Sequence, residues 1–83
     1  METTDAQEPY SLDLRGVRCP LNWAKAKVYI ETLPLAAYVE LLLDDPKGVR
    51  DIPQAAEAEG YSVVTCRRVV AAAPPCWRLL LQK

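Results

Sequence analysis

Cys19 is the residue best suited to chemistry in this chain, because it lies where a loop is predicted to become a helix. It is followed by Pro20 within the stretch RGVRCPLNWAKAKVY, residues 15–29. Proline fits the first position of a helix, where its missing N–H would have no partner, so the pattern predicts Cys19 as the N-cap. A helix N-terminus favours an anion and lowers the pKa of a cysteine thiol. With the positive charges of Arg15 and Arg18 nearby, we expect the sulfur to be held as a thiolate.

A lone reactive thiolate in this chain is suited to sulfur exchange. The sequence contains no histidine, and acyl transfer by a cysteine normally needs a neighbouring base and an oxyanion hole. Attack of a thiolate on a sulfur–sulfur bond needs neither, because its rate depends on the thiolate fraction, nucleophilicity and access. We therefore interpret Cys19 as a sulfur-carrying residue rather than as a small apolar residue at a helix start.

The other two cysteines, Cys66 and Cys76, are predicted to lie on facing strands. Alternation of side chains places them on one face with Arg68 and Arg78, where they could be cross-strand neighbours. Ordinary sheet cysteines are the favoured interpretation, and a resolving partner for Cys19 would require a proximity that the pattern does not define. Zinc sites usually contain closely spaced ligand pairs, so we expect no metal site and no cofactor.

Short strands and helices must position the cysteine. Gly16 lets the backbone turn after the first strand, and Gly60 is expected to terminate the second helix in a left-handed conformation. Pro53 is expected in the first turn of that helix, because a deeper proline would remove a hydrogen bond, which leaves open a separate short turn over 47–50. The predicted elements are a strand over 11–14, a helix over 20–33, a strand over 37–43, a helix ending at Glu59, and strands over 61–70 and 76–82.

This order, β-α-β-α-β-β, predicts an α+β fold. The last two strands are close enough in the sequence to form an antiparallel hairpin. Right-handed crossover connections place both helices on one face of a four-stranded mixed sheet, which gives a two-layer α/β sandwich. The chain of 83 residues has room for one domain, expected over 10–83 after a flexible N-terminal tail over 1–9.

The first helix carries two apolar arcs, and only one of them can face the core of so small a domain. The broader arc, which is expected to be buried, contains Trp23, Ala26, Tyr29, Ile30 and Leu33. The second arc contains Leu21, Ala24 and Val28. It is either additional core contact or an exposed apolar patch beside the sulfur, where a partner could dock. Lys25 and Lys27 are most simply solvated charges, although they could steer an acidic partner.

Composition argues against several classes of function. A net charge of -1 and a pI near 5.3 give no electrostatic reason to bind nucleic acid or anionic lipid directly. No apolar run approaches the ~18 residues that span a bilayer, and the first nine residues lack the features of a secretory signal. We therefore expect a cytoplasmic protein without a membrane segment. The odd cysteine count, 3, indicates thiols that are kept reduced.

Two segments, LDLRGVRCP over 12–20 and DDPKGVRDIP over 44–53, resemble the TusA/SirA-like sulfur-carrier proteins. The resemblance covers almost the whole chain after the tail, and the fold of that family agrees with the predicted order. It implies that Cys19 accepts sulfane sulfur from a cysteine desulfurase as a persulfide. The sulfur then passes to an acceptor protein, often toward tRNA 2-thiouridine formation.

The sequence around the cysteine matches the family motif at Gly16, Arg18 and Pro20, and differs from it at one position. The motif is Cys-Pro-any-Pro, and Asn22 stands here in place of the second proline. A proline has no N–H, whereas Asn22 supplies one that could reach the N-cap side chain. We therefore expect the Cys19 thiol to be at least as acidic as it would be beside a proline.

Three charged residues after the second predicted strand also match the family pattern, namely Asp45, Arg50 and Asp51. Locally they are interpreted as turn and cap residues at the start of the second helix. They could also shape a surface for a partner. The second hypothesis for function is a non-enzymatic interaction or redox-regulatory module that keeps the fold without sulfur transfer, and it predicts partner binding that Cys19→Ser leaves unchanged.

Overall fold

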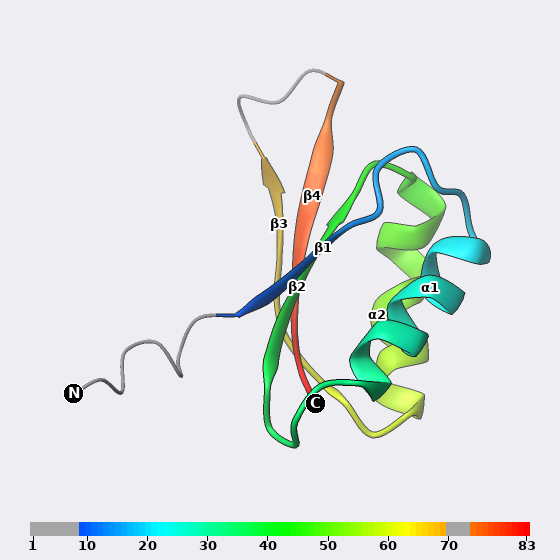
Figure 1. Ribbon diagram of the computed structural model, residues 1–83. Helices are drawn as coiled ribbons and strands as arrows, with labels where there is room; N and C mark the ends of the chain where they lie inside the picture. The colour runs from blue at the N-terminus through cyan, green and yellow to red at the C-terminus, as the bar shows by residue number, and fades with distance from the viewer. Residues whose placement is uncertain (1–8, 70–73) are drawn as a thin grey trace.

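Two helices cover one face of a four-stranded sheet in the residues that the structure describes, 9–69 and 74–83 (Figure 1). The computed structural model contains β1 (Tyr10–Asp13), α1 (Leu21–Glu31), β2 (Tyr38–Leu43), α2 (Pro46–Ala58), β3 (Ser62–Val69) and β4 (Cys76–Gln82). The strand order is β1-β2-β4-β3, with β1 parallel to β2 and the other neighbours antiparallel. The predicted α+β class and element order are confirmed. The tail predicted over 1–9 lies outside the described residues, apart from Pro9.

The core lies between the helices and the sheet. The side chains of strand β2 alternate between two faces: one face is buried against the helices, and the other carries Tyr38 and Glu40. The broader arc of α1 supplies Ala26, Ile30 and Leu33, with Trp23 and Tyr29 packed partly buried against the core. The fully buried side chains of the sheet and of α2 include Val39, Leu41, Leu43, Ile52, Ala56, Leu79 and Leu81.

Helix α1 ends at Glu31, two residues before the predicted end at Leu33. The N–H groups of Thr32 and Leu33 bond to carbonyls three residues back, at 3.0 Å each, so the last turn tightens out of the α-helical pattern. The ammonium of Lys83 donates to the carbonyl oxygens of Leu33 at 2.7 Å and Glu31 at 3.2 Å. The C-terminal lysine therefore caps this helix end.

Helix α2 begins earlier than predicted. Asp45 is its N-cap and accepts the Lys47 N–H, while Pro46 occupies the first turn, so residues 47–50 belong to the helix. Pro53 lies in the helix interior and not in the first turn, so that expectation was wrong. Gly60 terminates the helix with a φ of 89°, as expected.

Neither α1 nor α2, the helices of the described residues, has the length and apolar character needed to cross a bilayer.

The two sheet cysteines lie on opposite faces of the β3–β4 hairpin. A bulge between Val63 and Thr65 shifts the register, so that Cys66 pairs with Leu79 and Cys76 pairs with Val69. Because side chains alternate, the inserted residue reverses which face each later residue of β3 occupies. Cys66 is exposed and Cys76 is only 3% exposed. The two thiols are therefore neither cross-strand neighbours nor on one face.

Candidate functional site

The loop between β1 and α1 is tied to the segment that follows β2. Gly16, with a φ of 83°, makes the predicted turn, and its N–H donates to both carboxylate oxygens of Asp44 at 2.9 and 3.0 Å. The N–H of Cys19 donates to Asp45 Oδ2 at 2.7 Å. Parallel strands end at the same edge of a sheet, so the pairing of β1 with β2 brings the cysteine loop next to the start of α2.

Cys19 immediately precedes the N-cap rather than occupying it. The structure assigns the N-cap position to Pro20 and begins α1 at Leu21. The Ala24 N–H donates to the Pro20 carbonyl at 3.1 Å, as expected for an N-cap residue. The Asn22 N–H was expected to reach the cysteine side chain. It donates instead to the Arg18 carbonyl, at 3.1 Å. Cys19 nevertheless lies only two residues before Leu21, the first residue of α1, and it is partly exposed.

Arg50, in the first turns of α2, lies near enough to Cys19 for the charges of the two groups to interact, a proximity that the sequence pattern did not show. Its hydrogen bond to Asp51, at 3.1 Å, raises the pKa of the Arg50 guanidinium, and the nearby Cys19 sulfur adds to this shift. Arg15 is bound instead to Asp13 at 2.8 Å, and this pairing lowers the pKa of Asp13 to about 2. The Asp45–Pro46 helix start is the signal that could have placed Arg50 beside the site.

Asp45 joins the two helix starts. Its Oδ2 atom accepts from Cys19, and its Oδ1 atom accepts from the Lys47 N–H at 3.1 Å. These two bonds lower the pKa of Asp45, the bond from Cys19 having the larger effect, and the charge of Arg18 acts in the same direction. A polar cavity of about 350 Å³ adjoins this carboxylate, lined by Gly16, Arg18, Asp44, Asp45 and Pro46.

The described residues contain no group of three or more histidine, cysteine or acidic side chains arranged to hold a metal ion.

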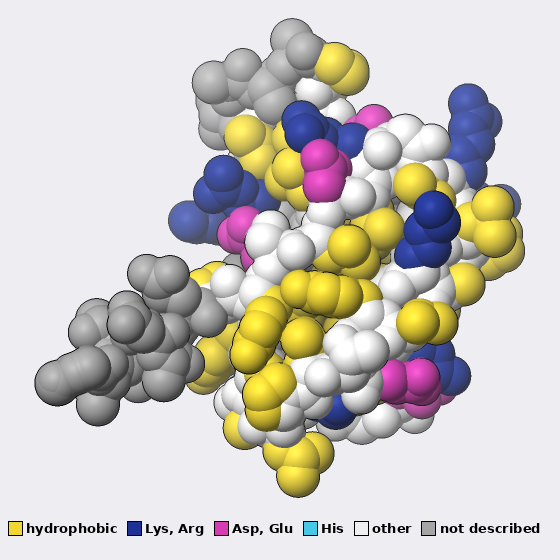
Figure 2. Space-filling model, viewed as in Figure 1, with side chains coloured by type: hydrophobic (Ala, Val, Ile, Leu, Met, Phe, Trp, Pro, Cys, Tyr) yellow, Lys and Arg dark blue, Asp and Glu magenta, His cyan; other side chains and the backbone are white. Residues whose placement is uncertain are grey.

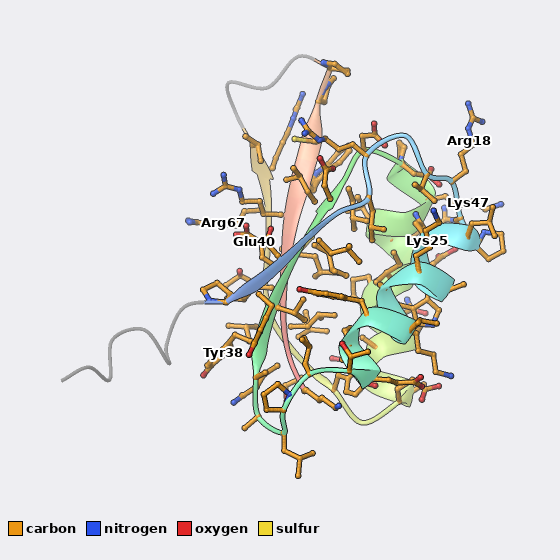
Figure 3. All side chains as sticks on the ribbon, viewed as in Figure 1. Arg18, Lys25, Tyr38, Glu40, Lys47 and Arg67 are labelled. Carbon is orange, nitrogen blue, oxygen red and sulfur yellow. The ribbon has the colours of Figure 1, made fainter. Side chains whose placement is uncertain are left out.

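The second arc of α1 is exposed next to the cysteine loop. Leu21 is 63% exposed and Val28 is 65% exposed. They line an open groove of about 560 Å³ together with Ala24, Lys25, Tyr29 and Thr32. Figure 2 shows hydrophobic and basic side chains next to one another on the surface over α1. In Figure 3, Arg18, Lys25 and Lys47 lie at the end of the molecule where α1 begins. Of the two interpretations of this arc, the structure favours an exposed apolar patch.

A comparison with known families decides the identity of the chain. The family model described as Sulfurtransferase TusA matches residues 10–83. The chain belongs to the TusA family. A curated relative of this TusA-family chain, from Archaeoglobus fulgidus, is named "Putative sulfur carrier protein"; the two are 29% identical over 72 residues, which cover 87% of this chain and 78% of the relative. The resemblance stated from the sequence is confirmed, and membership of the TusA family supports a role as a sulfur carrier that interacts with a sulfur donor and a sulfur acceptor.

Proposed function

We propose that this TusA-family chain accepts sulfane sulfur as a persulfide on Cys19 and relays it to an acceptor protein. One observation supports the proposal most directly. The partly exposed Cys19 thiol stands at the start of α1, with its backbone fixed by Asp45 and its sulfur near Arg50. An accessible sulfur near a helix N-terminus and a guanidinium is suited to thiolate chemistry.

The transfer requires two exchanges that conserve atoms and electrons. In loading, the Cys19 thiolate attacks the outer sulfur of a persulfide on a cysteine desulfurase. A new sulfur–sulfur bond forms on Cys19, the bond in the donor persulfide breaks, and the donor thiolate leaves. In unloading, a nucleophile of the acceptor attacks the outer sulfur and the Cys19 thiolate leaves. We place this relay in the cytoplasm, where it would serve tRNA thiolation or another sulfur pathway.

Each residue around the cysteine has a proposed part in this relay. Arg18 and Arg50 stabilise the anionic sulfur, and Asp45 fixes the loop by holding the Cys19 N–H. Arg15 and Gly16 shape the loop through their bonds to Asp13 and Asp44. Pro20 sets the start of α1. The partner surface consists of Leu21, Ala24 and Val28 on α1 together with Asp45, Arg50 and Asp51 at the start of α2.

Mass spectrometry after incubation with a cysteine desulfurase and free cysteine tests the proposal. The protein should gain one sulfur atom, mapped to the peptide that contains Cys19, and Cys19→Ser should gain none. Cys66→Ser is the matched control, since Cys66 is more exposed than Cys19 but lies on β3, and this variant should load normally. Failure to load, or loading that persists in Cys19→Ser, would contradict the proposal. The alternative, a binding module without transfer, predicts no loading but partner binding that Cys19→Ser leaves unchanged.

A further inference from the structure

Asn22 is a fully buried polar residue in the first turn of α1. Its side chain is 0% exposed. The Oδ1 atom accepts the Trp23 N–H at 2.7 Å, whereas the Nδ2 atom is buried and has no hydrogen-bond partner among the described residues. A buried donor without a partner destabilises a fold. The packing of this amide against its neighbours must offset that cost.

The buried Nδ2 atom lies against Gly48 in α2. A Cβ atom at Gly48 would overlap Asn22 Nδ2 and would lie 3.4 Å from Asn22 Cγ. Glycine is a poor helix former, and Gly48 does not have the left-handed backbone conformation that would favour it there. Close approach of the Asn22 side chain is thus the feature of this structure that requires glycine at position 48.

This contact is next to the hydrogen bond that anchors the cysteine. Asn22 follows Cys19 by three residues, and Gly48 follows Asp45 by three residues. The same two helix starts are therefore joined twice, once by the 2.7 Å bond from the Cys19 N–H to Asp45 and once by the packing of Asn22 on Gly48. Two elements joined at both points have little freedom to change their separation.

We propose that Asn22 and Gly48 form a size-matched contact that sets the distance between the starts of α1 and α2, and thereby positions Cys19 against Asp45 and Arg50. Both residues are positioning residues, since neither is placed in contact with the sulfur. The consequence for sulfur transfer rests on the proposed function. The contact itself, and its effect on the thiol, do not.

A double-mutant cycle in a Cys66→Ser background tests this contact. The variants are Gly48→Ala, Asn22→Ala and the double variant, and the readouts are urea unfolding and the rate of Cys19 alkylation against pH. Gly48→Ala overpacks the contact and should lower the folding equilibrium constant by about tenfold or more. It should also change the rate of Cys19 alkylation, because the loop that the Cys19 N–H anchors to Asp45 shifts relative to the start of α2. With Asn22→Ala present, the added methyl has space, so Gly48→Ala should have less than about a third of either effect.

Leu21→Ala is the control for non-specific effects, because Leu21 is adjacent to Asn22 but exposed. Its effect on folding should add to that of Gly48→Ala. Equal effects of Gly48→Ala with and without Asn22→Ala would overturn the proposal. If Gly48→Ala does not fold, refolding in the double variant supports the contact, and a double variant that remains unfolded contradicts it. Sulfur loading is not among the readouts, so a failed relay would leave this test intact.

Discussion

Truncation of the two most exposed apolar side chains on α1 should weaken binding of the sulfur donor. The perturbation is the double variant Leu21→Ala/Val28→Ala. Both side chains line the groove beside the cysteine loop, and both are largely exposed in the free protein. If a cysteine desulfurase docks there to reach Cys19, these side chains become buried only in the complex, so their removal should affect binding and not folding.

The magnitude follows from the area still exposed. Full burial of a leucine or valine side chain contributes about 1.5–3 kcal/mol. Leu21 is 63% exposed and Val28 is 65% exposed, so docking can bury roughly two thirds of each. Alanine keeps part of that contact, which leaves a loss of about 1 kcal/mol per residue and about 2 kcal/mol for the pair. A loss of that size weakens the Kd about 30-fold. The free energy of unfolding should change by less than about 0.5 kcal/mol, as for other surface substitutions.

Titration calorimetry with the desulfurase measures the Kd, and urea unfolding measures the stability. Leu35→Ala is the matched control, because Leu35 is 87% exposed but lies beyond the far end of α1 from Cys19. It should leave the Kd within about twofold. An unchanged Kd for the double variant, or an equal weakening by Leu35→Ala, would refute the assignment of this surface.

Two further predictions concern stability. Lys83→Met removes the ammonium that caps α1 through Leu33 and Glu31, and should lower the free energy of unfolding in urea by about 1–2 kcal/mol; an unchanged midpoint would show that the cap is dispensable. The pKa of Asp13 is lowered from 3.8 to about 2 in the folded protein. Its ionised carboxylate therefore stabilises the fold above pH 3.8, and this contribution is lost as the pH falls through about 2. The advantage in melting temperature over Asp13→Asn should therefore disappear across that window, and an advantage that persists at lower pH would contradict this account.

The sequence pattern was sufficient to predict features that depend only on residues close together in the chain. The alternation of β2 and the two arcs of α1 identified the buried faces, because each depends only on the repeat of a strand or a helix. The start of α2 shows the limit of this reasoning. Because an interior proline costs stability, the helix was predicted to begin close to Pro53. It begins seven residues earlier, at Pro46, with Asp45 as its N-cap. The packing of Ile52 and Ala56 in the core stabilises the helix on both sides of the proline.

The hairpin shows a second limit. Simple alternation carried along β3 places Cys66 with Cys76, but one bulge after Val63 reverses the faces. A bulge depends on how β3 pairs with β4, and no residue type in the sequence marked it.

The sequence by itself determined the order of elements, the buried faces and the placement of one cysteine just before a helix, because these features arise from interactions within a few residues. Only the tertiary structure decided which groups surround that cysteine. The parallel pairing of β1 with β2 brings Asp45, 26 residues away, to the Cys19 N–H. The same pairing places Arg50 near the sulfur, while Arg15 turns to Asp13. Contacts between distant residues depend on how strands and helices assemble, and the local pattern around Cys19 holds no information about that assembly.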